Sequence, residues 1–281
     1  MKKTLIALAV AASAAVSGSA MAGLGNFDAG NLNNKVDFGG TITPAVVQND
    51  WVWAVGQGYN QFSHTTRELT ESGTKLTITA ADVMPLLVGK TSKVTVGDVG
   101  ISPQIAFSDS KGTITPVWTG ENAEGTMTLT VNDAQQQEIG SMTLNVAAVA
   151  PVAWAKKDAS STVSVRSITG NGGASFEGAV GKFSSEPSFS QVDGITVAIG
   201  APSIAELQAQ VKSFPGLENI AEDTSDVVGG SAAYYGDSNY AYSGAYALGI
   251  PRGKQLVVKF NNAISAETQW NAPLTMQVSY R

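Results

Sequence analysis

The sequence contains no cysteine and a single histidine, and only 14% of its residues are charged. Without cysteine there can be no disulfide, no thiolate nucleophile and no cysteine-ligated zinc or iron–sulfur site. One histidine also excludes a metal site built from several imidazoles. The formal net charge is −6, which argues against a nucleic-acid binder because phosphate contacts require a basic face. We expect no cofactor and no nucleic-acid partner.

The sequence also lacks a catalytic motif. His64 lies in a polar stretch without a Gly-x-Ser-x-Gly motif, so we expect an exposed loop histidine. Gly89-Lys90-Thr91 resembles the end of a phosphate-binding loop, but Met84 stands where that motif needs its first glycine, and a turn at a strand end is favoured. Glu121 and Glu124 are typical of a solvated turn. We therefore predict that the protein is not an enzyme.

Residues 1–22 have the three-part pattern of a secretory signal. A basic start, Met1-Lys2-Lys3, precedes an apolar run from Thr4 to Val16 and the small-x-small site Ala20-Met21-Ala22. We predict cleavage after Ala22 and export. Beyond this signal no stretch reaches the roughly 18 apolar residues of a membrane-spanning helix. An exported chain without disulfides must obtain its stability from a large core or from partner chains.

Apolar and polar residues alternate along much of the chain, which indicates half-buried antiparallel strands. Turns rich in Gly, Asn, Asp and Pro separate the alternating segments, as in a β-sandwich. These segments are 75–79, 126–131, 141–146, 162–165, 255–260 and 274–280. The sequence therefore predicts a mainly β fold.

One segment has the period of a helix instead. Ser203 is a suitable N-cap, and Glu206 three residues later completes a capping box. The predicted helix ends at Phe214, before Pro215. Its apolar face would consist of Ile204, Leu207 and Val211. Because the chain is long for one sandwich, we predict that residues 150–242 form an inserted subdomain that contains this helix.

The two ends of the mature chain carry alternating patterns that have two interpretations. The first pattern puts Val36, Phe38, Gly40 and Ile42 on one face of a strand, and the second does the same with Leu274, Met276, Val278 and Tyr280. Both segments could be ordinary strands at the termini of a domain. Alternatively, they could be strand-addition elements, in which alternate side chains fill pockets along a sheet edge.

Several segments are similar to one known family. They are Met1–Ala9, Asn26-Phe27, Val36–Thr43, Trp51–Gly56, Gly73–Thr79, Ile105–Phe107, Ala245–Ile250, Thr268–Leu274 and Val278–Tyr280. The chain resembles the major, adhesive subunits of enterobacterial chaperone–usher fimbriae of the FaeG type. The resemblance covers residues 1–110 and 243–281 well, 111–150 loosely, and 150–242 little beyond the helix.

The resemblance implies an incomplete immunoglobulin-like β-sandwich that lacks its final strand. Residues 23–44 would be a donor-strand extension and residues 45–281 the pilin domain. A periplasmic chaperone would fill the open groove first, and at the outer-membrane usher the extension of an identical subunit would replace it. Val36, Phe38, Gly40 and Ile42 would then be the donor residues. Leu274, Met276, Val278 and Tyr280 would form the acceptor edge that the chaperone contacts. The product would be a fimbrium on the cell surface.

The resemblance also implies an adhesin for host glycans, with binding in the inserted subdomain. Residues of that segment have suitable chemistry, because aromatic faces alternate with amide and carboxylate groups. The candidate residues are Trp154, Tyr234, Tyr235, Asn239 and Tyr240. Tyr240 and Tyr242 could equally be strand residues that pack beside Tyr246. The alternative function is a stand-alone secreted β-sandwich that binds carbohydrate as a monomer.

Overall fold

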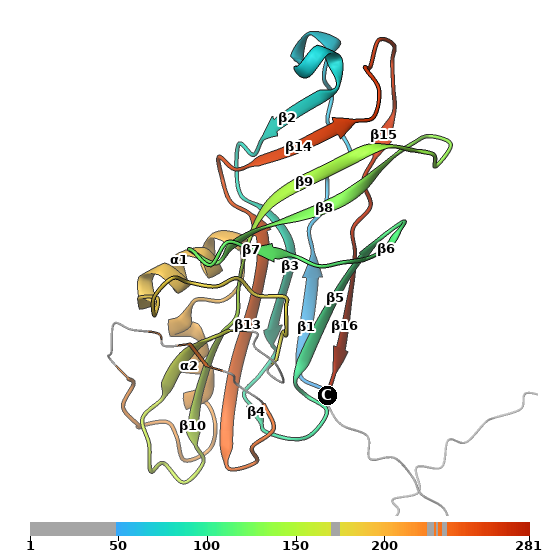
Figure 1. Cartoon of the computed structure of the whole chain (residues 1–281). Helices are drawn as coiled ribbons and strands as arrows, with labels where there is room; N and C mark the ends of the chain where they lie inside the picture. The colour runs from blue at the N-terminus through green and yellow to red at the C-terminus, as the bar shows by residue number, and fades with distance from the viewer. Residues whose placement is uncertain (1–48, 170–174, 224–227, 229, 232–234) are drawn as a thin grey trace, which may run out of the picture. The chain divides into compact units, whose positions relative to one another are not determined.

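A computed structural model describes residues 49–169, 175–223, 228, 230–231 and 235–281, and most of them form antiparallel strands. All of them belong to one unit, Val46–Arg281. The fold is mainly β, a sandwich with a helical segment, as the alternating sequence predicts (Figure 1). No helix in the described ranges is long and apolar enough to cross a membrane.

The elements follow one another along the chain in this order. The first strands are β1 (Trp51–Val55), β2 (Lys75–Thr79), β3 (Met84–Thr91), β4 (Thr95–Val96), β5 (Pro103–Asp109), β6 (Gly112–Ile114), β7 (Val117–Trp118), β8 (Glu124–Asp133), β9 (Glu138–Val149), β10 (Pro151–Lys156) and β11 (Ser164–Ile168). Helices α1 (Phe189–Ile199) and α2 (Ile204–Lys212) come next, then β12 (Gly230–Ser231), β13 (Tyr240–Ile250), β14 (Gln255–Phe260), β15 (Trp270–Asn271) and β16 (Thr275–Tyr280). Two short 3₁₀ helices, η1 (Thr66–Glu68) and η2 (Glu71–Gly73), lie between β1 and β2.

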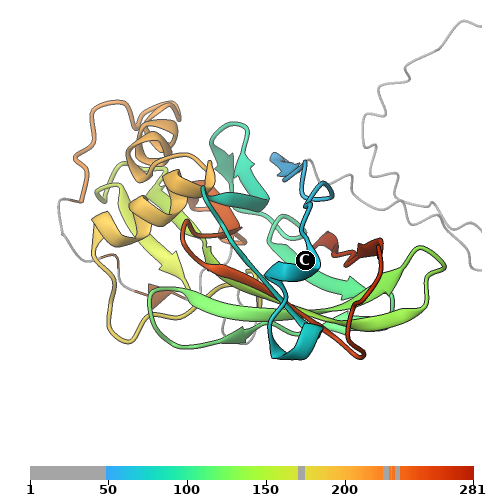
Figure 2. The same ribbon diagram turned by 90° about the horizontal axis from the view of Figure 1, so that it is seen from above.

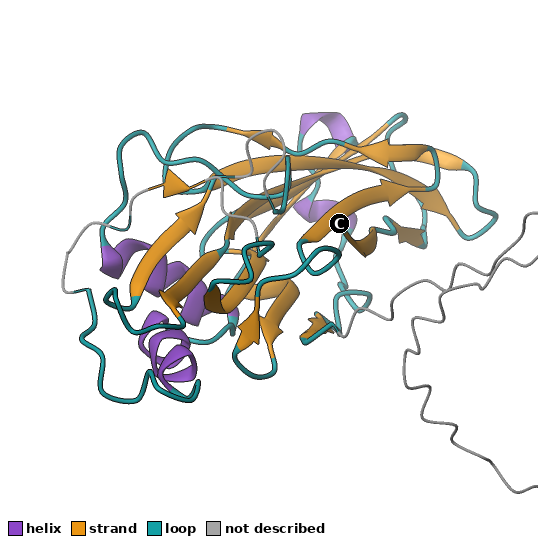
Figure 3. Cartoon of the chain, turned by 90° about the horizontal axis from the view of Figure 1, so that it is seen from below, coloured by secondary structure: helices purple, strands orange, loops and turns teal. Residues whose placement is uncertain are grey.

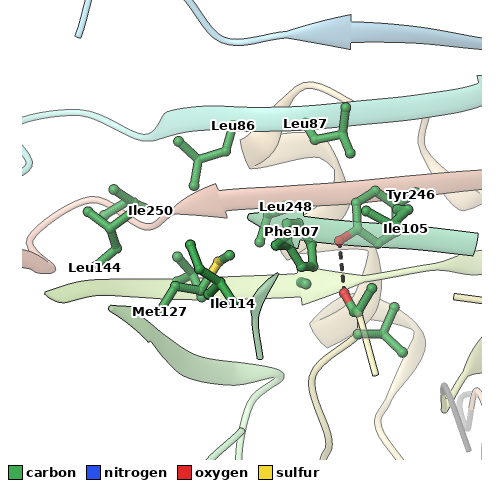
Figure 4. Close-up of a cluster of buried hydrophobic side chains, with 14 of the residues drawn as sticks. Leu86, Leu87, Ile105, Phe107, Ile114, Met127, Leu144, Tyr246, Leu248 and Ile250 are labelled. Carbon is green, nitrogen blue, oxygen red and sulfur yellow. Dashed lines mark hydrogen bonds between the residues drawn. The ribbon is translucent and has the colours of Figure 1, made fainter. Parts of the chain in front are cut away.

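Strand β13 is the centre of the larger sheet. Its first half pairs with β10 and β4, and its second half pairs with β3 and β9. Every residue of β13 after Tyr240 is buried, because the strand is covered on both faces. A separate three-stranded sheet has the order β16-β5-β6. Side chains from both sheets meet in the main core, where Phe107 and Ile105 of β5 lie near Leu248 of β13 (Figure 4).

The two helices lie together on one side of the strands, at the end formed by β10, β11 and the first half of β13 (Figures 2 and 3). The strand residues in the core beneath them are small. They include Ala153, Ala155, Ala241, Ala245 and Ala247. Because alanine side chains are short, the helices can approach the sheet closely, and they form a second core. This arrangement agrees with a helical segment inserted into a β-sandwich, while the exact limits 150–242 remain a prediction.

Helix α2 confirms the predicted capping box. The Ser203 hydroxyl accepts a hydrogen bond from the Glu206 backbone N–H (3.2 Å), and the Glu206 carboxylate accepts one from the Ser203 N–H (2.7 Å). This backbone N–H, together with the Ser203 hydroxyl, lowers the pKa of Glu206. The helix ends at Lys212, two residues before the predicted end at Phe214. Sequence periodicity therefore located this element almost to the residue.

Helix α1 was not predicted from the sequence. It also begins with a capping box, formed by Ser188 and Gln191. However, Gly194 and the β-branched Thr196 and Val197 occupy its centre and second half, and such residues disfavour a helix. The buried face of α1 instead packs against the strands, so tertiary contacts compensate for its weak propensity.

Candidate functional site

An open groove lies between the free edges of two strands that belong to different sheets. Strand β1 pairs only with β3, and β16 pairs only with β5. Within the described residues no strand pairs with the second edge of either one. The two strands nevertheless lie along the same groove, because Val55 of β1 and Met276 of β16 both line it. Figure 1 shows β1, β5 and β16 side by side.

The groove is deep and largely apolar, with a volume of about 700 Å³. Its floor reaches the centre of the sandwich, where β8, β9, β13 and β14 contribute aliphatic side chains. These are Leu129, Met142, Leu144, Ile250 and Leu256. Exposed apolar surface of this depth is unusual on a monomeric soluble protein and marks a binding surface.

Strand β16 has the alternation that the sequence predicts. Leu274, Met276, Val278 and Tyr280 are half-buried, and the residues between them, Thr275, Gln277 and Ser279, are exposed. The four apolar side chains pack against the main core without being enclosed by it. In a complete sandwich the core-facing side chains of such a strand would be covered by a neighbouring strand. Here they stay half-exposed along the whole length of β16, as expected for a sandwich that lacks a strand.

A hydrogen bond between an indole and a phenol connects the two strands that border the groove. The Trp53 indole Nε1–H donates a hydrogen bond to the Tyr280 hydroxyl oxygen, at 2.8 Å, and so joins β1 to β16. The indole can lie flat across β3 because its cross-strand partner is Gly89, where a Cβ atom would come within 2.3 Å of the ring. The Gly89-Lys90-Thr91 segment is thus part of strand β3 and supports the groove, and is neither a phosphate-binding loop nor a turn.

At the other end of the groove, Phe62 and Trp270 form an aromatic rim. The rings of Phe62 and Trp270 stack with centroids 6.4 Å apart and planes within 3°. His64 stacks on the far side of Phe62, at 6.5 Å. Its Nδ1 lies 3.4 Å from a carboxylate oxygen of Glu68. The only histidine of the chain is therefore part of a surface stack at the groove rim.

The predicted donor residues Val36, Phe38, Gly40 and Ile42 lie outside the described residues, as do the predicted signal peptide and Tyr234. Their roles therefore remain predictions. The groove that the donor residues are predicted to fill is, by contrast, fully described.

The remaining glycan candidates lie on neighbouring strands. Strand β10 pairs with β13 so that Lys156 is opposite Tyr240 and Trp154 is opposite Tyr242. Trp154 and Tyr240 are both half-buried, and Arg166 lies over the Trp154 ring at 5.9 Å. A shallow cavity of about 410 Å³ adjoins Tyr240. Its lining consists of Lys156, Lys157, Asp158, Asp237, Asn239 and Tyr240.

The prediction of a glycan contact is wrong for Tyr235. Its side chain is completely buried, with the ring edge against Trp51 (centroids 5.5 Å apart) and beside Tyr242 (5.4 Å). Burial raises the pKa of Tyr235 and leaves no ring face for a sugar. Tyr242 is also a packed strand residue, as the alternative interpretation held, and burial raises its pKa to about 12. Tyr240 keeps part of its surface exposed.

Of the parts of the groove, only the β16 wall is predicted by the sequence. The alternation of β16 was visible because it is local. The floor, the Trp53–Tyr280 hydrogen bond and the aromatic rim join residues that are far apart in the chain, so no local pattern could show them. A signal for β1 existed in Trp51-Val52-Trp53, where two indoles share one face.

The fold and the groove are those of a β-sandwich protein of assembly or adhesion. A family model described as "Fimbrial, major and minor subunit" matches residues 1–281. The chain is 34% identical to the K88 fimbrial protein AC of Escherichia coli over 295 residues, and 33% identical to the F41 fimbrial protein of the same species over 291 residues. Both comparisons cover 100% of each chain.

The chain therefore belongs to the family of major and minor fimbrial subunits, of the K88 type. Members of this family are structural or adhesive proteins and polymerise with identical or related subunits. The protein is accordingly a component of a cell-surface fimbrium.

Proposed function

We propose that this fimbrial subunit is polymerised by donor-strand exchange, and that the groove receives residues 23–44 of a second copy. Val36, Phe38, Gly40 and Ile42 of the incoming strand face the groove floor. The observation that supports this proposal is the pair of unpaired strand edges, β1 and β16, which border one apolar groove.

An inserted strand would correct two physical defects of the isolated subunit. It would provide hydrogen-bond partners for the free backbone groups of both edges, which otherwise invite aggregation. It would also cover the half-buried side chains of β16, and so remove apolar surface from water. The three-stranded sheet and the larger sheet would become continuous. The free energy of unfolding of the subunit then includes the free energy of binding the incoming strand.

The same defects support a chaperone–usher route. A subunit with an open apolar groove cannot remain free at high concentration without aggregating. A periplasmic chaperone that adds its own strand to the β16 edge protects the groove until the subunit reaches the outer-membrane usher. There the extension of the next identical subunit replaces the chaperone, and the fibre grows on the cell surface.

The groove is tested with a synthetic peptide of residues 33–44. The receptor is the full mature chain with Phe38→Asp, so that its own extension cannot donate and the protein stays monomeric. We expect the peptide to bind and to raise the thermal unfolding midpoint, because it completes the sandwich. Calorimetry and a thermal scan measure both effects.

A matched peptide with Asp37→Asn keeps the apolar face and should bind as well as the native sequence, whereas a peptide with Phe38→Asp should not bind. If none of the three peptides shifts the midpoint, donor-strand exchange through this segment is wrong. A monomeric, stand-alone carbohydrate-binding sandwich then becomes the better explanation.

We also propose that the surface around Trp154, Asn239 and Tyr240 binds host glycans. The observation that favours it is the half-buried Tyr240 ring, which lines a cavity with lysine, aspartate and amide groups, while the half-buried Trp154 lies on β10, the strand paired with β13. Aromatic faces stack on the C–H faces of sugars, and the polar groups can pair with hydroxyls.

Removal of the exposed ring tests the glycan proposal. Fibres with Tyr240→Ala should bind an array of mammalian oligosaccharides about tenfold more weakly, which corresponds to about 1.4 kcal/mol. Fibres with Val117→Ala, a change of an exposed residue on β7, should bind normally. Equal binding by both variants would contradict the assignment of this surface.

A further inference from the structure

The two ends of the groove carry different groups, and this difference determines which surfaces of consecutive subunits can be in contact. At one end the chain enters β1 at Trp51, beside the C-terminus (Figure 1). There the last residue pairs with Ser102, with both N···O distances 3.1 Å. At the other end of the groove lies the rim stack of Phe62, His64 and Trp270. We call these the entry end and the rim end.

The direction of the incoming strand follows from fibre growth. Strands β1 and β16 run in opposite directions along the groove (Figure 1), and Trp53 of β1 is hydrogen-bonded to Tyr280 at the C-terminal end of β16. Pairing alone therefore permits either direction. However, a filament needs contacts between two different ends of the subunit, because a contact between like ends closes as a dimer. Each extension leaves from the entry end, so the incoming strand must come in over the rim end.

The chain between the donor segment and β1 then brings two copies close together. Eight residues, 43–50, connect Ile42 to Trp51. Fully extended, the nine Cα–Cα steps from Ile42 to Trp51 span at most about 32 Å. With Ile42 of the second copy in the groove, the linker confines the entry end of that copy to within this distance of the groove of the first, on the side of its rim.

The entry end carries an apolar side chain that the fold of one copy does not use. Val99 is 78% exposed, more than any of the other exposed large hydrophobic residues, Val52, Val55, Val117 and Val197. Its loop is held in place on both sides. The backbone N–H groups of Gly97 and Asp98 donate to the carbonyls of Tyr240 and Tyr235, and Ile101 is 3% exposed. Val99 is thus presented outward by a fixed loop.

The rim end has a matching apolar surface. The rings of Phe62 and Trp270 are only half-buried, and His64 extends the stack toward solvent. The Glu68 carboxylate holds this segment, because it accepts a 2.6 Å hydrogen bond from the Thr65 N–H, which lowers the pKa of Glu68.

We infer that consecutive copies make a second contact besides the exchanged strand, in which Val99 of one copy packs on the Phe62–Trp270–His64 stack of its neighbour. The partner is a second copy of this chain. The inference rests on the proposed donor-strand exchange. It adds a contact that orients one subunit on the next across the linker 43–50.

Because the native chain has no cysteine, a pair of engineered cysteines can test this contact by forming a disulfide between subunits. Fibres of the double variant Val99→Cys and His64→Cys are oxidised, boiled without reductant and run on an SDS gel. We expect covalent multimers that reductant converts to one band. The matched control, Val117→Cys with His64→Cys, uses another exposed valine and should give only monomer. Multimers in the control alone, or monomer in both, would overturn the inference.

A second pair of variants separates this inference from the proposed function. Fibres of Val99→Asp should be at least tenfold less abundant on the cell surface than fibres of Val117→Asp. Peptide 33–44 should nevertheless stabilise the Phe38→Asp chain equally with and without Val99→Asp. Normal fibres from Val99→Asp would refute the second contact and leave strand exchange standing. Failure of the peptide to bind the Phe38→Asp chain would refute strand exchange itself.

Discussion

Fibres should disappear when Phe38 is replaced by aspartate. The wild-type surface fraction, run unheated on an SDS gel, is expected to show a ladder of multimers that collapses to one band on boiling. In the Phe38→Asp variant the ladder should be absent. Loss of a buried aromatic ring costs about 1.5–3 kcal/mol, and burial of a carboxylate in an apolar groove costs several more. Together they correspond to at least about a hundredfold weaker strand binding.

Asp37→Asn is the control for this prediction. In the proposed donor strand, residue 37 would lie between two groove-facing positions and point away from the groove, so the ladder should persist. The Phe38→Asp subunit should still be exported and recovered with its chaperone, since the change is outside the acceptor groove. A normal ladder from Phe38→Asp would show that this segment is not the donor.

Replacement of Tyr246 by alanine should have the largest effect on the stability of the subunit itself. Tyr246 is completely buried in β13, its ring stacks on Phe176 (5.0 Å), and it lies 6.1 Å from Trp53 of the groove wall. Its hydroxyl donates a 2.8 Å hydrogen bond to the carbonyl of Ala179 (Figure 4). Removal of such a ring costs about 3–5 kcal/mol, and the buried carbonyl loses its partner as well.

Tyr246→Phe separates these two contributions. It keeps the ring contacts and removes only the hydrogen bond, so we expect a loss of about 1–3 kcal/mol. Denaturant unfolding of the peptide-bound Phe38→Asp chain, with and without each change, measures both values. Equal losses from alanine and phenylalanine would mean that the ring contributes nothing, contrary to its burial. Burial raises the pKa of Tyr246, so the phenol stays neutral and the difference should not vary around neutral pH.

Much of the secondary structure was predictable because its signals are local. Alternation identified β2, β14 and β16 at nearly their observed limits, and the Ser203–Glu206 capping box identified α2. Helix α1 could not be predicted in the same way. Its intrinsic preference is weak, and the small residues of β10 and β13 that it packs near come from other parts of the chain.

The candidate sites were predictable only in part. The alternation of β16 is observed as expected, but the groove beside it needs β1, β8, β9 and β14, which the sequence separates widely. Among the glycan candidates, sequence could not distinguish Tyr235 from Tyr240. Both are tyrosines in one polar, aromatic segment, yet one is fully buried and the other is half-exposed.

By itself, the sequence determined the mainly β fold and the alternating strand at the C-terminus, because composition and periodicity act over a few neighbouring residues, and its similarity to known fimbrial subunits identified the family. Only the tertiary structure decided that β1 and β16 border one groove with edges that no other described strand pairs with, and that Trp53 and Tyr280 join them. Strand pairing brings together residues more than two hundred positions apart, and no local pattern specifies which edge stays free.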